Sequence, residues 1–155
     1  MSKSMKRVSR ALADAGIEVE IVELGTARTA QEAAEGVGCH LDQIAKSIIF
    51  AGETSGEALL FLTAGGNMVD QAKASALAGE PLCKADAALI RAQTGFAIGG
   101  VAPLGHLNPI RAWTDPKLLT FERIWAAAGT PHHVFALNPA DLLRISGSQQ
   151  ADFVQ

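Results

Sequence analysis

The sequence predicts an α+β fold in which helices flank a mixed, curved, barrel-like β-sheet. Strand-like and helix-like segments alternate irregularly, whereas a doubly wound fold would repeat one strand and one helix in regular order. Two apolar runs follow each other directly in the middle of the chain, and strand-like runs are again adjacent near its end. Neighbouring strands of this kind indicate a sheet that contains antiparallel pairs.

Helix signals recur along the whole chain. Apolar residues return at helical spacing from Met5 to Ala15. Thr29 and Glu32 have the spacing of a capping box, and Asn138 precedes a proline and an acid, a strong helix start. Two further helices are expected after Asp70 and Asp86. A glycine ends each helix, and these glycines are Gly16, Gly36 to Gly38, Gly79, Gly95 and Gly147.

Six segments are expected to form strands: residues 17–21, 45–51, 58–64, 110–113, 123–127 and 133–137. In the first segment, apolar residues alternate with Glu18 and Glu20, which predicts a strand with one solvated face. The second and third are separated by the polar residues 52–56, and we expect an antiparallel hairpin there. No linker, repeat or low-complexity segment is apparent, so residues 1–155 are expected to form one domain.

The composition excludes several functional classes. Hydrophobic residues make up 48% and charged residues 19%, as in ordinary globular proteins. A net charge of −3 argues against a general nucleic-acid coat and against DNA as a partner, although a local basic patch could still contact one end of an RNA. Cys39 and Cys83 match no metal spacing, and we interpret them as free thiols, with a disulfide between them as the alternative.

The sequence shows no targeting or membrane segment. The basic start of the chain is not followed by an apolar run, which a signal peptide would have. No window approaches the roughly 18 apolar residues of a membrane-spanning helix. We therefore expect a cytoplasmic protein that does not contact a membrane.

Lys46 is the first candidate functional residue because it is a single cation at the start of an apolar strand. Spacing alone favours a lysine that extends from a sheet edge to solvent. The functional interpretation is a fixed, partly desolvated ammonium that pairs with a phosphate or polarises an ester carbonyl.

The second candidate is the segment from Gly99 to Pro103, which has the form G-x-x-x-P. Its glycines permit positive φ, and consecutive N–H groups turned to one side would bind an oxyanion or a phosphate. The glycine pattern alone favours a tight crossover without such a role. The segment lacks the Gly-Lys-Ser/Thr end of a Walker motif and the spacing of a dinucleotide-binding fingerprint.

Four histidines lack the spacing of metal ligands, so we expect neither a metal site nor a cofactor: His40, His106, His132 and His133. His106 follows the glycine loop and could line a pocket, and His132 lies in a turn between two expected strands. Solvated surface histidines are the alternative for both. No serine or cysteine has the setting of a covalent nucleophile, so an enzyme with this sequence would act by binding, orienting and polarising its substrate.

The chain resembles the YbaK/EbsC family, whose fold is shared with the editing domain inserted in bacterial prolyl-tRNA synthetases. The similarity runs from about Ile17 to Gly147 and is strongest over residues 29–34, 43–50, 96–103 and 134–142. The combination of the lysine strand with the G-x-x-x-P loop is the specific part of the match.

The resemblance implies a freestanding aminoacyl-tRNA deacylase that hydrolyses the ester on a mischarged tRNA. It assigns Lys46, Gly99 and Gly100 to catalysis. The implied substrate-binding residues are Val101, Ala102, Pro103, His106, Thr130 and His132. The implied partners are the acceptor end of an aminoacyl-tRNA and an aminoacyl-tRNA synthetase.

Two points stay open at this level. Ala102 stands where cysteinyl-specific members usually carry a serine, so a pocket for a small aliphatic or hydroxyl amino acid is at least as plausible as one for cysteine. A tRNA(Pro)-type substrate is expected. The alternative function is a non-catalytic module that binds a tRNA end, a nucleotide or a synthetase through the same pocket.

Overall fold

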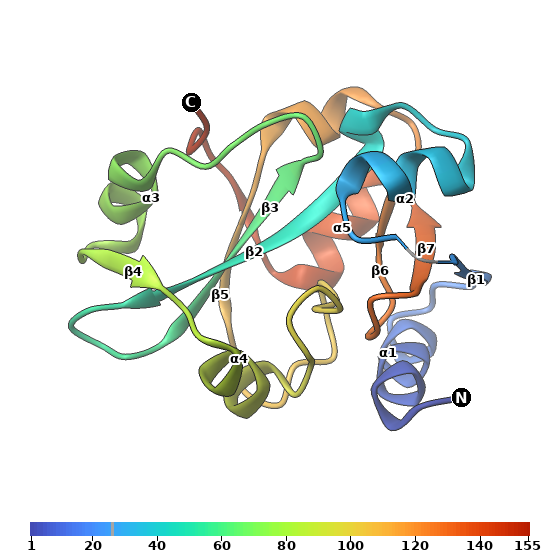
Figure 1. Cartoon of the computed structure of the whole chain (residues 1–155), viewed down its shortest axis with the longest axis horizontal. Helices are drawn as coiled ribbons and strands as arrows, with labels where there is room; N and C mark the ends of the chain where they lie inside the picture. Colours follow the sequence, from blue (N-terminus) through green and yellow to red (C-terminus); the bar gives the residue numbers. More distant parts are fainter. Residues whose placement is uncertain (26) are drawn as a thin grey trace.

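One mixed sheet of eight strands organises the protein in a computed structural model that describes residues 1–25 and 27–155 (Figure 1). The strands are β1 (Ile21–Glu23), β2 (Ile44–Gly52), β3 (Ala58–Ala64), β4 (Leu82–Lys84), β5 (Arg111–Thr114), β6 (Ile124–Ala127), β7 (His133–Leu137) and β8 (Gln149–Gln150). The α-helices are α1 (Lys3–Asp14), α2 (Ala30–Val37), α3 (Gln71–Ala78), α4 (Ala87–Thr94) and α5 (Pro139–Ser146). Two short 3₁₀ helices are η1 (Leu41–Gln43) and η2 (Pro116–Thr120).

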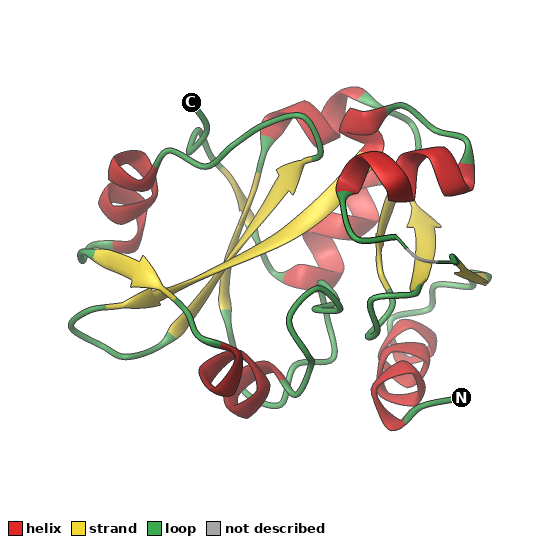
Figure 2. Cartoon of the chain, in the orientation of Figure 1, coloured by secondary structure: helices red, strands yellow, loops and turns green. Residues whose placement is uncertain are grey.

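The sheet has the order β1-β7-β6-β2-β3-β5-β8, with β4 paired to β2 outside this path. Four pairs are antiparallel (β1 with β7, β6 with β7, β2 with β3, and β2 with β4). Three pairs are parallel (β2 with β6, β3 with β5, and β5 with β8). The expected mixed sheet flanked by helices is confirmed, and so is the antiparallel hairpin of β2 and β3 (Figure 2).

The structure differs from the expected strands at three places. The predicted strand over residues 17–21 begins only at Ile21, because β7 pairs with residues 21–23. Ile17 and Val19 instead pack on the hydrophobic core and have no strand partner among the described residues, so their alternation with acids reflects burial rather than pairing. The short strands β4 and β8 were not expected from the sequence.

The helix starts follow the predicted capping residues. At α2, Thr29 Oγ1 accepts a hydrogen bond from the Glu32 amide at 3.1 Å. The Glu32 carboxylate accepts from the Arg28 amide at 2.6 Å, one residue before the position that a capping box would use. The α2 N-terminus therefore holds the backbone of Arg28 in place.

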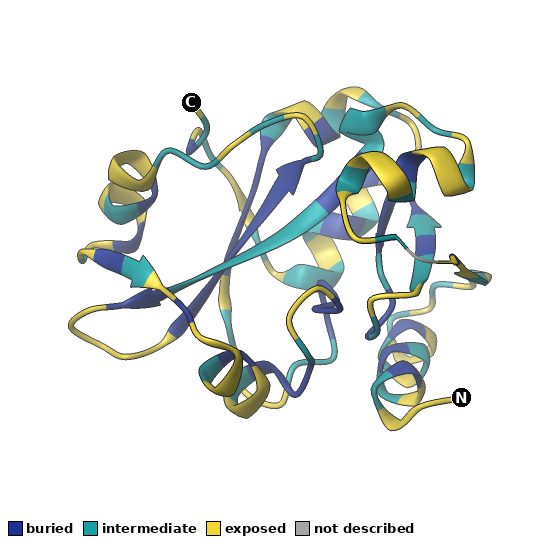
Figure 3. Cartoon of the chain, viewed as in Figure 1, coloured by how far each residue is buried: buried dark blue, intermediate teal, exposed yellow. Residues whose placement is uncertain are grey.

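Strand β3 lies in the centre of the sheet and is buried along its whole length (Figure 3). Its partner β2 is buried at both ends and half-buried between them. Helix α1 covers one side of the core with Met5, Val8 and Leu12. Cys39 and Cys83 are free thiols. Among the helices of the described residues, none has both the length and the apolar character to cross a membrane.

Candidate functional site

The candidate site lies where the β2 edge loses its strand partners. Strand β3 pairs with β2 from Ala45 to Ala51, so β6 and β4 must share the opposite edge. On that edge β6 pairs only with residues 44–45 and β4 only with residues 50–52. Within the described part of the chain, residues 46–49 therefore have no strand partner there, and the glycine loop approaches this gap.

A cavity of about 340 Å³ opens along this edge. Its walls come from β2, β6, β7, α2 and the loops before α2, after α4 and before β7. Much of the lining is apolar, including Ala33, Ile44, Trp125 and Val134. Lys46, Ser47, Thr130 and His133 add polar groups. An apolar pocket with a few convergent polar groups is the usual form of a small-ligand site.

Lys46 lines this cavity from a half-buried position on β2. Its Nζ donates a hydrogen bond to the Asn67 carbonyl at 2.6 Å. Among the described residues this is its one acceptor, so two of the three ammonium donors stay available to a ligand. Burial lowers the pKa of Lys46, and the charges of Asp115 and Asp42 oppose that change.

The acceptor of Lys46 is itself held in place by a buried carboxylate. Asp115 is 1% exposed, and its Oδ2 accepts hydrogen bonds from Asn67 Nδ2 at 2.9 Å and from the Ala64 amide at 3.1 Å. Its Oδ1 accepts from the Lys117 amide at 3.0 Å. The ammonium is therefore positioned by a satisfied network rather than by a flexible surface contact.

The glycine loop opens with a turn that requires glycine. The Gly100 amide donates to the Ala97 carbonyl at 3.0 Å, and Gly99 at the third position of this turn has φ +85°. Ile98 does not have a positive φ, so the turn has the form of type II. The Gly100 N–H is thus used within the loop. The N–H groups of Gly99 and Val101 have no acceptor within residues 1–25 and 27–155, and because both residues line the cavity, they are the donors available to a ligand oxygen.

Gly100 is required for a different reason, the close approach of the two cavity walls. A Cβ at this position would lie 2.7 Å from Thr130 C and 3.0 Å from Pro131 N. These are backbone atoms of the opposite cavity wall, so the absence of a side chain lets the two walls meet. On the β2 side, Ser47 Oγ donates to the Val101 carbonyl at 2.7 Å and ties the loop to the strand that carries Lys46.

Helix α1 and His106 hold the other side of the loop. Arg7 donates from Nε to the Gly105 carbonyl at 2.7 Å and from Nη2 to the Gly95 carbonyl at 3.0 Å, so one guanidinium ties both ends of the loop. His106 Nε2 lies 2.7 Å from the Ala102 carbonyl and acts as the donor. Burial lowers the pKa of His106; its hydrogen bond to the Ala102 carbonyl opposes that change, and the Arg7 charge adds to it.

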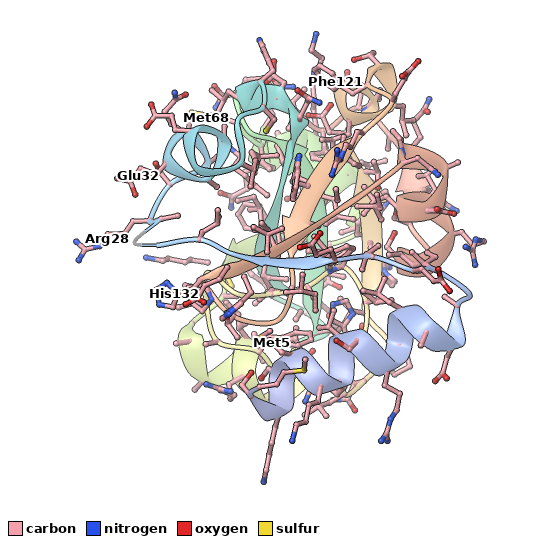
Figure 4. All side chains as sticks on the ribbon, turned by 90° about the vertical axis from the view of Figure 1, so that its right-hand side faces the viewer. Met5, Arg28, Glu32, Met68, Phe121 and His132 are labelled. Atoms are coloured by element: carbon pink, nitrogen blue, oxygen red, sulfur yellow. The ribbon has the colours of Figure 1, made fainter. Side chains whose placement is uncertain are left out.

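The wall opposite the loop contains a polar pair. Thr130 Oγ1 lies 2.6 Å from His133 Nδ1, and both residues line the cavity. His132 is exposed instead, and its Nδ1 lies 3.3 Å from the Gly25 carbonyl. Figure 4 shows His132 and Arg28 projecting from the same side of the molecule, where the segment before α2 meets the segment before β7.

The structure brings together part of the predicted site. Lys46, Gly99, Val101 and Thr130 line one cavity. The other predicted residues, Gly100, Ala102, Pro103, His106 and His132, are not part of its lining. Gly100 and His106 act on the cavity indirectly, through the wall contact and the loop carbonyl described above.

Sequence reasoning missed three residues of the site: Ser47, His133 and Arg7. Ser47 and His133 directly follow Lys46 and His132, which the sequence predicts as candidates. The only signal for them was that side chains alternate between the two faces of a strand. Nothing in the sequence indicated Arg7, since its contacts join residues 88 and 98 positions apart.

Comparison with known proteins places this geometry in a family. Residues 25–145 match the family model of the aminoacyl-tRNA editing domain, which includes β2, the glycine loop and β7. The chain belongs to the aminoacyl-tRNA editing domain family.

Individual relatives agree with this membership. The chain is 30% identical over 147 residues to an uncharacterized protein, YwhH, of Bacillus subtilis (strain 168). The aligned region covers 94% of this chain and 93% of that protein. A crystal structure of a proposed trans-editing enzyme for prolyl-tRNA synthetase is 45% identical with a TM-score of 0.93, covering 100% of this chain and 99% of the other. The crystal structure of a hypothetical protein designated APE2540 is 23% identical with a TM-score of 0.86 and shares the fold. The match covers 96% of this chain and 99% of that chain.

The described residues contain no group of three or more His, Cys, Asp or Glu side chains arranged to hold a metal ion. The residues that line the cavity carry an ammonium, backbone amides, hydroxyls and an imidazole. This set is suited to binding phosphate or carbonyl oxygens.

Proposed function

We propose that this chain is a freestanding trans-editing deacylase that hydrolyses the ester bond of a mischarged aminoacyl-tRNA. Its membership of the editing-domain family supports the reaction class. The observation that carries the proposal is that one cavity is lined both by Lys46 and by Gly99 and Val101, whose amides have no acceptor among the described residues.

In the proposed reaction, water adds to the ester carbonyl carbon and the bond to the ribose oxygen breaks. A proton passes from the water to the leaving oxygen, giving a free amino acid and a tRNA with a free terminal hydroxyl. The loop amides stabilise the negative charge that develops on the carbonyl oxygen, and Lys46 binds the terminal phosphate or the ester. An aminoacyl ester is already activated, so positioning and polarisation suffice without a side-chain nucleophile.

The proposed substrate is a small amino acid on a tRNA(Pro)-type molecule. Ala33, Ile44, Trp125 and Val134 make an apolar wall, and the Thr130–His133 pair offers polar contacts to the amino acid. The tRNA type is proposed from the relative that is described as acting with prolyl-tRNA synthetase. A synthetase is a proposed partner on the same ground.

A panel of labelled aminoacyl-tRNAs tests the proposal. Cysteine, alanine, serine and threonine are each presented on tRNA(Pro) and on their cognate tRNAs. We expect loss of one or two esters, and a decrease of about 10²- to 10³-fold in kcat for Lys46→Ala, the usual effect of removing one preorganised donor. Lys84→Ala, an exposed lysine on β4, is the matched control.

The outcomes separate the candidate functions. Hydrolysis that survives unchanged in Lys46→Ala would remove Lys46 from the mechanism. Saturable tRNA binding without loss of any ester would favour the non-catalytic module. Circular dichroism of Lys46→Ala shows whether a loss of rate reflects unfolding.

A further inference from the structure

Helix α1 carries an unpaired cationic face. Lys3, Lys6 and Arg10 are exposed and follow one another at helical spacing, and the first acid of the chain is Asp14. Within the part of the chain that the structure describes, none of these three cations forms a salt bridge. A protein with a net charge of −3 thus concentrates positive charge on one helix face.

This arrangement opposes local helix electrostatics. The N-terminal turns of a helix carry a partial positive charge and favour acids over lysines. Helices α2 and α5 follow this rule with Glu32 and Asp141 in their first turns. Helices α3 and α4 have no acid in the first turn but begin with an aspartate N-cap, whereas α1 has an acid at neither place and carries Lys3 and Lys6. Departures from local preference without a compensating contact are expected where a residue serves binding.

The helix that carries the cationic face packs against the wall of the candidate site through another face, which contains Ser4 and Val8. A Cβ on Gly129 would lie 2.9 Å from the Ser4 carbonyl, so the first turn of α1 packs directly against the segment that continues into Thr130 and Pro131. Both of those residues line the cavity.

We infer that Lys3, Lys6 and Arg10 bind the phosphate backbone of the tRNA acceptor stem while the 3′ end occupies the cavity. The inference rests on the proposed function, because the cavity then fixes where the RNA strand begins. The three residues span about 10 Å along the helix, given its rise of 1.5 Å per residue. Met5, Val8 and Leu12 fill the core, so no apolar face of α1 is free to enter a membrane.

The first test measures binding of an uncharged RNA minihelix with the acceptor stem of tRNA(Pro). The variant Lys3→Gln/Lys6→Gln/Arg10→Gln is expected to bind at least tenfold more weakly at about 50 mM salt. Each phosphate contact contributes about 0.7 to 0.9 to the slope of log K against log salt. The slope should therefore fall by about 2 to 3 in the variant.

A matched variant removes the same charge elsewhere. Lys84→Gln/Arg91→Gln/Lys117→Gln changes three exposed cations on β4, α4 and η2 and should alter binding less than twofold. The variant Lys3→Arg/Lys6→Arg/Arg10→Lys keeps the charge and should bind like the wild type. Equal weakening in the matched variant, or wild-type binding by the glutamine variant of α1, would overturn the inference. Thermal unfolding verifies that all variants are folded.

Hydrolysis separates this inference from the proposed function. On full aminoacyl-tRNA, the α1 variant should show a raised KM with little change in kcat. On a 3′-aminoacyl-adenosine ester, which lacks the stem, it should match the wild type. If the wild type hydrolyses neither substrate but the α1 variant still loses minihelix binding, the proposed deacylase function is refuted and the inference that α1 binds RNA is supported.

Discussion

Replacing Gly100 by alanine tests whether the two cavity walls must meet as the structure has them. The new methyl group would lie 2.7 Å from Thr130 C and 2.8 Å from Thr130 Cα, whereas ordinary contacts of a Cβ begin near 3.4 Å. The walls must therefore separate by about 0.7 Å, and both neighbouring atoms belong to the backbone. We expect a loss of about 1–3 kcal/mol in the free energy of unfolding, the usual cost of overpacking.

The effect on catalysis should exceed the effect on stability. A displacement near 1 Å of the groups that polarise a substrate can lower the rate by about 100-fold. Single-turnover hydrolysis of the best ester from the aminoacyl-tRNA panel measures this loss, and urea denaturation measures stability. Gly100→Ala should be about 100-fold slower under conditions in which it remains folded.

Gly56→Ala is the matched control. Gly56 has φ +71° in the loop between β2 and β3, and its Cβ would meet nothing within 4 Å. Alanine there should cost about 1–2 kcal/mol of stability through its backbone conformation, without moving the site. Wild-type hydrolysis by Gly100→Ala, or equal rate losses in the two variants, would refute the wall-contact argument.

Two further predictions concern the groups that hold the glycine loop. Ser47→Ala should cost about 0.5–1.5 kcal/mol of stability, and it should lower kcat about tenfold because the Val101 carbonyl loses its donor. Ser47→Thr keeps the hydroxyl and is the control. An unchanged kcat in the alanine variant would contradict the prediction. For His106, burial lowers the folded pKa below the usual 6.5, so the unfolded chain binds more protons as the pH falls through that value. The free energy of unfolding should therefore decrease below about pH 6.5 in the wild type, and it should decrease less in His106→Gln. Chemical denaturation at several pH values measures this, and parallel profiles of the two proteins would disprove the prediction.

Local signals in the sequence predicted the elements that depend on local contacts. Thr29 and Asn138 begin helices because their side chains bond to amides three residues ahead, and a glycine ends each helix within the same turn. The pairing of β8 was not predictable in this way. Residues 149–150 pair with β5, more than thirty positions earlier, and two residues carry no alternation pattern.

The residues of the candidate site likewise divide into those marked by local sequence signals and those that depend on distant contacts. Lys46 and Gly99 were predicted because an isolated cation in an apolar strand and a G-x-x-x-P loop are visible within a few residues. Which of His132 and His133 faces the cavity depends on where β7 begins, because a shift of one residue exchanges the two faces of a strand. The Arg7 contacts with Gly95 and Gly105 depend on the docking of α1, which no short pattern encodes.

The gap in the β2 edge has a consequence for how selectivity can change within this fold. Lys46 belongs to a strand that is paired along its length with the fully buried β3, so its position is as stable as the core. Thr130 and Arg28 lie instead on connections between elements, where substitutions and insertions disturb the core least. A library that varies only these connections should therefore yield folded proteins that keep the same cation and accept different amino acids.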